Sequence, residues 1–311
     1  MRFHAILPLR DEADIIGQCL TQLLTWVDAV YLFDTGSVDD SWEIVQEFAA
    51  RDKRVIPLKK DAVFFSETHL RGWMFNQART RMRDGDWFLR VDADEFHHIP
   101  PPEFVATEMR PYETIAYHQY YDFRLTESEV KLWESSQETA ADRSRPIQER
   151  RRWFTPSVYS EPRLCKYRAT MQWPPTVSFP FNAGFVARAR LPIRHYPHRD
   201  PLQLSLRCKL RAIMMADREN RSILHWSEAD WRNFIARDDD PALVYWRPGT
   251  DLTRPAYNTH LAKPHIRLLQ RVTHQMLLPI LDRSRPTWPN QAGPRPLPEH
   301  LTALLKGALT D

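Results

Sequence analysis

The chain has 311 residues, of which 42% are hydrophobic and 27% are charged. This balance is typical of a globular protein and argues against a disordered or fibrous one. The net charge of +3 is too small to indicate a nucleic-acid partner by itself. The chain has 8 glycines and 25 prolines, where an average composition would give roughly 22 and 16. So few glycines argue against a phosphate site built on a glycine-rich loop.

The chain shows no sign of a secreted or membrane-spanning protein. Its three cysteines are odd in number and far apart, which indicates a reducing compartment and argues against a disulfide scaffold or a zinc cluster. No stretch approaches the roughly 18 apolar residues of a transmembrane helix. Charged residues at 10–12 interrupt the first apolar run, unlike a signal peptide. We therefore expect a cytoplasmic protein.

The first hundred residues alternate between strand and helix patterns. Apolar runs predict strands at 3–8, 28–33, 54–58 and 87–91, and helical spacing predicts helices at 12–26, 37–50 and 68–83. This alternation favours an α/β fold, with a mostly parallel, Rossmann-like sheet that has helices on both faces. Ligands of such sheets bind beyond the carboxyl ends of the strands, where Arg10, Asp34 and Asp92 fall.

Beyond residue 112 the pattern becomes less regular. It predicts a strand at 114–121, a long mobile loop at 127–152 that contains five arginines, and short strands broken by prolines at 163–195. A helix is expected at 201–219. The remainder is rich in tryptophan and proline and ends in a short helix at 299–309.

The motif Asp92-Ala93-Asp94-Glu95 directly follows a hydrophobic strand. Residues i and i+2 of an extended segment project to the same side, so the carboxylates of Asp92 and Asp94 can converge on one point. Such a pair repels unless a proton or a cation lies between its members. Oxygen ligands favour Mg²⁺ or Mn²⁺, which usually binds through one or two carboxylates and substrate phosphates. The alternative is a solvated acidic turn.

A second acidic turn follows another strand, in Asp34-Thr35-Gly36-Ser37-Val38-Asp39. Asp34 can accept hydrogen bonds from a ribose or a base, while the amides of the next helix face an anion. The alternative is an Asx turn in which Gly36 supplies the unusual backbone angles.

Four segments, in this order along the chain, resemble the motifs of the family 2 glycosyltransferases, which have the GT-A fold. They are Leu7-Pro8-Leu9-Arg10-Asp11-Glu12, Asp34-Thr35-Gly36-Ser37-Val38-Asp39, Asn76-Gln77-Ala78-Arg79-Thr80 and Gly85-Asp86-Trp87-Phe88-Leu89-Arg90-Val91-Asp92-Ala93-Asp94-Glu95-Phe96. The resemblance implies a nucleotide-sugar donor, a divalent metal and transfer of a glycosyl group to an acceptor, with inversion expected at the sugar.

The resemblance also implies roles for individual residues. Pro8, Arg10 and Glu12 would border the nucleotide, and Asp34 would contact the base or ribose. Either Arg71 or Arg79 would approach the base or phosphates. Asp92 would face the ribose and the metal, and Asp94 would be the main metal ligand.

A weaker resemblance lies downstream. Pro162-Arg163-Leu164-Cys165-Lys166-Tyr167 is similar to a P-R-L-F-R strand of many relatives, and the segment that begins Ile193-Arg194-His195-Tyr196 is similar to an H-Y-x-x-R segment. His195 is a candidate third metal ligand, because a neutral imidazole binds Mn²⁺. The alternative is a histidine that caps a strand or packs in a cleft.

The catalytic base is not identified by the sequence. Relatives carry G-x-V-H-E after the P-R-L strand, whereas this chain has Pro175-Thr176-Val177-Ser178-Phe179, so the expected acid is absent. The candidates for deprotonating the acceptor are Glu95, Asp122 and Glu161. Glu95 can instead buttress the metal motif. Base and stereochemistry therefore stay open.

The sequence thus predicts a metal-dependent glycosyltransferase. A GT-A domain is expected at 1–200, with a nucleotide-binding half at 1–100 and an acceptor half at 101–200, followed by a helical extension at 201–311. The expected partners are a nucleoside-diphosphate sugar and a glycan or glycolipid acceptor, with Mn²⁺ or Mg²⁺ as cofactor. Peripheral contact with the inner membrane face stays open. The alternatives are a noncatalytic glycan- or anion-binding protein and a sugar-nucleotide nucleotidyltransferase.

Overall fold

A computed structural model describes residues 1–174, 177–180, 183–216, 230–252 and 293–307, together with seven positions between 268 and 280. The chain divides into two compact units that interleave along the sequence. The first comprises 1–120, 157–194 and 251–296, and the second comprises 121–156, 195–250 and 297–311. Within the described part, no helix is both long and apolar enough to cross a membrane.

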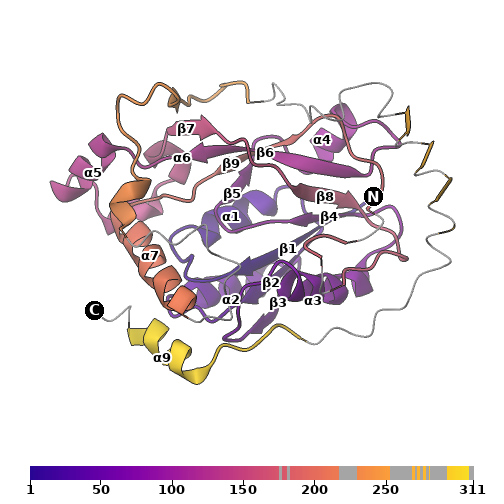
Figure 1. Cartoon of the computed structure of the whole chain (residues 1–311), viewed down its shortest axis with the longest axis horizontal. Coiled ribbons are helices and arrows are strands. Elements are labelled where there is room, and N and C mark those ends of the chain that lie inside the picture. Colours follow the sequence, from indigo (N-terminus) through magenta and orange to yellow (C-terminus); the bar gives the residue numbers. More distant parts are fainter. Residues whose placement is uncertain are drawn as a thin grey trace. The chain divides into compact units, whose positions relative to one another are not determined.

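The first unit is built on four parallel strands. They are β1 (Phe3–Leu9), β2 (Ala29–Asp34), β3 (Val55–Lys60) and β4 (Trp87–Arg90), which lie side by side in the order β3-β2-β1-β4 (Figure 1). The connections contain α1 (Ile16–Leu23), α2 (Ser41–Arg51) and α3 (His69–Ala78), the last continued by a 3₁₀ turn at Arg79–Arg81. The order places a topological switch point between β1 and β4, where ligands of such sheets bind.

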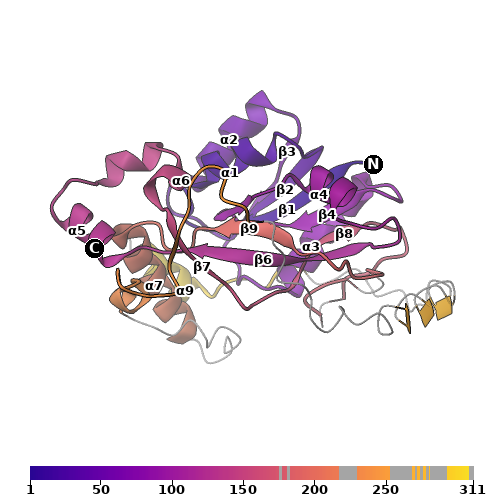
Figure 2. The same cartoon turned by 90° about the horizontal axis from the view of Figure 1, so that it is seen from above.

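Helices cover both faces of this sheet. Alternate strand residues, such as Ile6, Tyr31 and Phe88, pack with Met74 and Phe75 of α3 in one buried cluster. Helices α1 and α2 lie on the opposite side of the sheet (Figure 2). Right-handed crossovers dictate this arrangement, since the chain moves in one direction from β1 to β3 and returns across the sheet to β4.

Antiparallel strands extend the sheet beyond β4. Strand β8 (Pro162–Lys166) pairs with β4, and β6 (Ile115–Phe123) pairs with β8. The short strand β5 (Glu95–His97) pairs with β9 (Leu191–His195), which also pairs with β6, and α4 (Pro101–Thr107) follows β5. The predicted α/β class with helices on both faces is confirmed, and the parallel pairing is confined to β3-β2-β1-β4.

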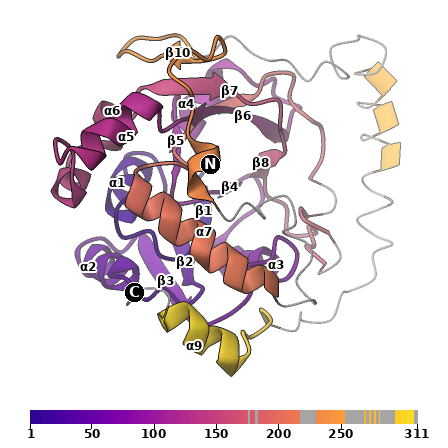
Figure 3. The same cartoon turned by 60° about the vertical axis from the view of Figure 1, so that its left-hand side comes forward.

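The second unit combines a small antiparallel sheet with helices. Its sheet consists of β10 (Val244–Tyr245), β7 (Trp153–Pro156) and the last residues of β6. Its helices are α5 (Glu127–Glu134), α6 (Ile147–Arg150), α7 (Pro201–Ala216) and α9 (Glu299–Gly307), with 3₁₀ turns at Ala140–Ser144 and Trp231–Phe234. Helices α7 and α9 lie beside each other (Figure 3). The buried side chains of α9 are Leu301 and Leu305.

The prediction of a long mobile loop at 127–152 is wrong. Thr126 and Glu129 form a capping box that starts α5, in which each side chain bonds the backbone amide of the other residue. Arg150 and Arg151 are buried and pair with Glu138, with Nε of Arg150 lying 3.0 Å from that carboxylate. Arg150, Arg151 and Glu138 therefore form a buried ion-pair network inside the segment expected to be a solvated loop.

The other expected elements form close to their predicted positions. Helix α2 begins later than predicted, at Ser41, whose amide donates to Oδ1 of Asp39 at 3.0 Å. Much of the extension expected at 201–311 lies outside the described residues, including 217–229 and 253–267. The boundary at residue 200 stays a prediction about the family domain, because the two compact units follow a different, interleaved division.

Candidate active site

Two loops of the first unit meet where β1 and β2 end. The amide of Asp11 donates to Oγ of Ser37 at 2.9 Å, and the amide of Glu12 donates to Oγ of Ser41 at 2.8 Å. Asp11 adopts a positive φ of 52°, a conformation rare for residues other than glycine. These bonds tie the loop after β1 to the start of α2, so the predicted donor residues at this edge belong to one connected structure.

Asp34 ends β2 and is fully buried. Its Oδ1 accepts hydrogen bonds from the amides of Gly36, at 2.8 Å, and Ser37, at 2.6 Å, which form the Asx turn considered from the sequence. Gly36 has φ +102°, and a Cβ there would lie 3.1 Å from Cα of Ala62. The other oxygen, Oδ2, is buried without a hydrogen-bond partner among the described residues. Burial raises the pKa of Asp34 despite the two amide bonds.

Pro8 and Arg10 lie on the neighbouring strand end. Pro8 is buried within β1, opposite Phe33 in the register with β2. Arg10 follows the strand, and its Nη1 donates to the carbonyl oxygen of Thr35 at 3.3 Å. Burial lowers the pKa of Arg10, and the carboxylate of Asp11 acts in the opposite direction. The structure therefore brings these two predicted donor residues to the same edge as Asp34.

Asp92 follows β4 and lies between two arginines. Arg71 of α3 pairs with Oδ1, and Nη2 of Arg163 of β8 lies 3.3 Å from Oδ2. Both guanidinium groups are buried, whereas the Asp92 side chain is 31% exposed. Burial acts to raise the pKa of Asp92, but the two arginines more than offset it, so this pKa lies below its ordinary value. Asp92 is therefore a carboxylate that is already neutralised by protein cations.

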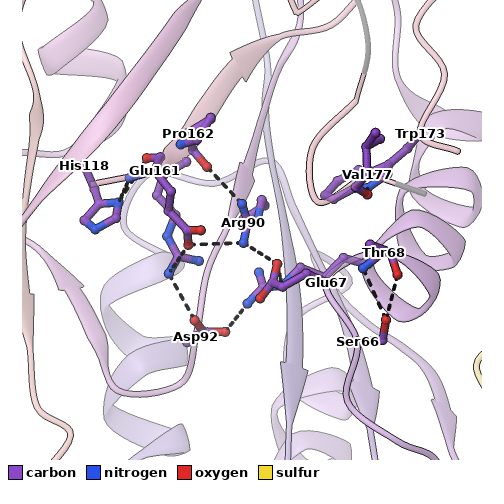
Figure 4. Close-up of polar contacts among 12 residues, drawn as sticks. Ser66, Glu67, Thr68, Arg90, Asp92, His118, Glu161, Pro162, Trp173 and Val177 are labelled. Atoms are coloured by element: carbon purple, nitrogen blue, oxygen red, sulfur yellow. Dashed lines mark hydrogen bonds and ion pairs between the residues drawn. The ribbon is translucent and has the colours of Figure 1, made fainter. Parts of the chain in front are cut away.

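A third buried arginine extends this cluster. Arg90 of β4 pairs with Glu67, and its Nη2 lies 3.2 Å from Oε1 of Glu161 (Figure 4). The same Glu161 oxygen lies 3.1 Å from Nη2 of Arg163, and Nε of Arg71 lies 3.1 Å from Glu67. The network therefore joins α3 and the start of β8 to the carboxyl end of β4.

The backbone between Asp92 and Glu95 is a turn rather than an extended strand. Strand β4 ends at Arg90, and the amide of Glu95 donates to the carbonyl oxygen of Asp92 at 3.1 Å. The expectation of an extended backbone through Asp92 and Asp94 is therefore wrong, whereas the convergence of their carboxylates stays a prediction. Asp94 is buried within this turn. Among the described residues, no group of three or more histidine, cysteine and acidic side chains is placed to hold a metal ion.

The base candidates and the second predicted arginine have different surroundings. Glu95 is buried, and Glu161 is paired with Arg90 and Arg163. Arg79 donates to the carbonyl oxygen of Ala169. It lies eight residues after Arg71 in the chain, which corresponds to about 12 Å along a helix. Of the two arginines considered, Arg71 is thus the one at Asp92.

Asp122 and His195 meet in the second unit. Nδ1 of His195 lies 2.7 Å from Oδ1 of Asp122. A carboxylate at one ring nitrogen fixes the orientation of an imidazole, whether the other nitrogen meets a proton or a metal. The sequence suggested separate roles for these two residues, which lie 73 positions apart in the chain, and gave no sign of their pairing.

Arg90, Arg163 and Tyr120 were not among the predicted site residues. Arg90 had one sequence signal, since it is a charged residue inside the apolar strand Trp87-Phe88-Leu89-Arg90-Val91. Arg163 lay in the recognised P-R-L segment. Tyr120 had no such signal, because its hydroxyl reaches the site only through strand pairing. Pro175 and Thr176, where relatives carry the segment with the acid, lie outside the described residues.

The parallel strands, the switch point and the acidic strand ends define an α/β protein of the GT-A type. The model of the glycosyl transferase family 2 matches residues 5–162, slightly more than half of the chain. The chain therefore belongs to glycosyl transferase family 2. Comparison with curated proteins finds no significant match.

Solved structures that resemble the chain include two glycosyltransferases. One is the mannosyltransferase PcManGT from Pyrobaculum calidifontis in complex with GDP-Man and Mn²⁺, at 15% identity and a TM-score of 0.30 over 53% of this chain and 44% of that chain. The other is glucosyl-3-phosphoglycerate synthase from Mycobacterium tuberculosis with Mn²⁺, UDP and glucosyl-3-phosphoglycerate, at 15% identity and a TM-score of 0.27 over 53% and 56%. The chain thus spans about half the length of these structures.

Proposed function

We propose that the protein transfers a sugar from a nucleoside-diphosphate donor to a glycan, glycolipid or similar acceptor, with a divalent cation at the Asp92–Asp94 turn. Family membership supports the reaction class. The observation that carries the proposal is that Asp34 and the Asp92–Asp94 turn lie at the same edge of the sheet. Asp34, at the end of β2, has a buried carboxylate oxygen that bonds no described residue, and the Asp92–Asp94 turn follows β4.

The donor set of the turn fits Mg²⁺ or Mn²⁺. Hard cations prefer carboxylate oxygens, and Mg²⁺ commonly binds through one or two carboxylates with phosphate oxygens and water completing its shell. Because both oxygens of Asp92 pair with arginines, the cation would bind mainly through Asp94, with Asp92 as the neighbouring acid. A site of this kind does not need a third protein ligand. When bound, the cation would neutralise charge on the leaving diphosphate.

The chain's own residues would bind and orient the donor. Asp34 would accept a hydrogen bond from the ribose or base through Oδ2, because this oxygen has no partner among the described residues and its burial makes an unmet bond costly. Pro8, Arg10 and Glu12 would border the nucleotide from the adjoining loop. Arg71 would hold Asp92 in place and bring positive charge toward the phosphates.

The base that deprotonates the acceptor stays open among Glu95, Asp122 and Glu161. Both oxygens of Glu161 are engaged, one by Arg90 and Arg163 and the other by the hydroxyl of Tyr159 at 2.8 Å. The arginines lower the pKa of Glu161 despite its burial, which makes it a weaker base. Asp122, which pairs with His195 in the second unit, stays a candidate for this proton transfer.

A binding panel followed by a turnover assay tests the proposed function. UDP, GDP, CDP and dTDP sugars are added with and without Mn²⁺, and the unfolding midpoint is followed. A donor at 100 times its Kd stabilises the folded state by about 2.7 kcal/mol, which gives a measurable shift. We expect one nucleotide to shift the midpoint only with Mn²⁺, and an acceptor mixture to release its diphosphate.

Three other results would contradict the proposal. Binding without any release of diphosphate, in the presence of acceptors or of water, would favour a noncatalytic glycan- or anion-binding protein. Formation of a sugar nucleotide and pyrophosphate from a nucleoside triphosphate and a sugar phosphate would favour a nucleotidyltransferase. If no nucleotide sugar shifts the unfolding midpoint, the protein has no donor site of the proposed kind.

A further inference from the structure

The side chain of Glu95 fixes the turn that carries Asp92 and Asp94. Its Oε2 accepts the amide hydrogen of Asp92 at 3.0 Å, while the amide of Glu95 donates to the carbonyl oxygen of Asp92 at 3.1 Å. These reciprocal bonds hold both ends of a four-residue turn, and Asp94 is its third residue. Any displacement of the Glu95 carboxylate would therefore move Asp94.

Two buried residues in turn hold Glu95. The hydroxyl of Tyr120, on β6, donates to Oε1 of Glu95, and Nη2 of Arg163 lies 2.8 Å from the same oxygen. Arg163 also donates to the Tyr120 hydroxyl. Tyr120 is 6% exposed, Arg163 4% and Glu95 1%. Water cannot easily replace a lost partner at this depth, so each bond constrains the others.

Arg163 also contacts Asp92 directly. Besides Glu95 and Tyr120, its Nη2 lies 3.3 Å from Oδ2 of Asp92. One guanidinium group therefore fixes the separation between the carboxylate of Asp92 and the carboxylate that holds the turn. The aromatic ring of Tyr120 lies under this guanidinium, with 5.6 Å from Cζ of Arg163 to the ring centroid.

We propose that Glu95, Tyr120 and Arg163 form a positioning unit that places Asp92 and Asp94 for a divalent cation. This inference rests on the proposed function, because it assumes that a donor and a cation bind at this turn. It assigns Glu95 a positioning role rather than that of the catalytic base. Both Glu95 oxygens are engaged inside the fold, whereas a base must reach the acceptor hydroxyl.

The variant Tyr120→Phe tests the positioning unit, because it removes one hydroxyl and keeps the ring. Tyr117→Phe is the matched control, on the same strand, since Tyr117 packs against the core and its hydroxyl bonds no residue of the described part. Mn²⁺ is titrated against each protein at a saturating level of the nucleoside diphosphate that stabilises the wild type. The half-saturating Mn²⁺ concentration is read from the shift in unfolding midpoint.

We expect the half-saturating Mn²⁺ concentration to rise 10- to 100-fold in Tyr120→Phe, as is typical when a group that orients a metal ligand is lost. It should not change in Tyr117→Phe. A purely structural role of Tyr120 would lower the midpoint of the free protein without changing this concentration, and would overturn the inference. If Tyr120→Phe does not fold, Glu95→Gln takes its place with the same expected rise. Glutamine has one acceptor oxygen instead of two, so it cannot accept both from the amide of Asp92 and from Tyr120 and Arg163.

The wild type separates failure of this inference from failure of the proposed function. If no nucleoside diphosphate stabilises the wild-type protein with Mn²⁺, the proposed function fails and the inference fails with it. If the wild type responds and both Tyr120→Phe and Glu95→Gln respond equally, only the positioning unit is overturned.

Discussion

The guanidinium group of Arg71 pairs with the carboxylate of Asp92 although the Arg71 side chain is fully buried. This contact joins α3 to the end of β4 across the switch point of the sheet. Burial acts to lower the pKa of Arg71, but Asp92 and Glu67 more than offset it, so the guanidinium stays charged. Asp92, the first acid of the motif, is thus held by Arg71 and Arg163 without a bound donor.

Replacing Arg71 should therefore have a much larger effect than replacing Arg79. Arg71→Ala leaves Arg163 as the cation that pairs with the Asp92 carboxylate in the described part of the chain, and we expect a loss of about 3 kcal/mol in unfolding free energy. Arg79→Ala removes a partly exposed side chain and should cost less than about 1 kcal/mol. Urea unfolding of both variants measures the difference. Equal losses would contradict the assignment of Arg71 as the buried partner.

Asp34→Asn should separate nucleotide binding from folding. The remaining side-chain oxygen of asparagine can still accept from the amides of Gly36 and Ser37, so the turn should form. The second position becomes a donor in place of Oδ2, which no described residue bonds. We expect nucleoside-diphosphate affinity to fall at least 10-fold, measured by calorimetry, with an unfolding midpoint near that of wild type. Wild-type affinity would show that Asp34 does not contact the donor.

His97 should make the protein less stable in acid. Its ring is buried against Trp26, with centroids 5.1 Å apart, and neither ring nitrogen has a partner among the described residues. Burial, with a smaller effect from Arg163 and Arg194, lowers the pKa of His97 from 6.5 to about 3. The unfolded chain therefore takes up a proton below pH 6.5 that the folded protein does not. The unfolding free energy therefore decreases as pH falls from 6.5 toward 3, by about 2 kcal/mol at pH 5.

The variant His97→Phe isolates this contribution. It removes the titrating group and keeps an aromatic ring against Trp26, so unfolding free energy should depend less on pH between 6.5 and 4.5 than in wild type. His69→Phe, at an exposed position, is the control and should keep the wild-type dependence. Parallel pH profiles for all three proteins would show that His97 titrates in the folded state as in the unfolded one.

Arg151 should be the most sensitive arginine of the 143–152 segment. It is fully buried and makes two bonds to the carboxylate of Glu138, at 3.1 and 3.0 Å. Removing one partner of a buried pair costs about 3–5 kcal/mol, so Arg151→Ala should reduce the unfolding free energy by this amount. Arg145→Ala, at an exposed side chain, should cost less than about 1 kcal/mol. Similar behaviour of the two variants would restore the mobile-loop interpretation.

The sequence was most informative where local pattern and structure coincide. Strands β1 to β4 and their helices were predicted because apolar periodicity alone specifies buried faces. The segment 127–152 was misjudged because the arginines that stabilise it look like solvated charges until Glu138 and Asp200 are seen beside them. In one dimension, a buried ion pair and a surface charge are indistinguishable.

The candidate site was likewise predicted only in part. Asp34 and Asp92 could be placed at one sheet edge because both directly follow parallel strands. The partners of Asp92 could not, since Arg71 and Arg163 are 21 and 71 residues away in the chain. The turn at 92–95 was also missed, because the side-chain bond that closes it comes from Glu95, which in sequence continues the acidic run.

The most direct test of the account is the turnover of a nucleotide sugar by wild type and by Asp94→Asn, with Mn²⁺ and with release of nucleoside diphosphate as the readout. Transfer to water suffices for this measurement, so the acceptor need not be known. We expect Asp94→Asn to reduce the rate at least about 100-fold, because Asp94 is the proposed main metal ligand. Turnover by Asp94→Asn at the wild-type rate would contradict the proposed cation site.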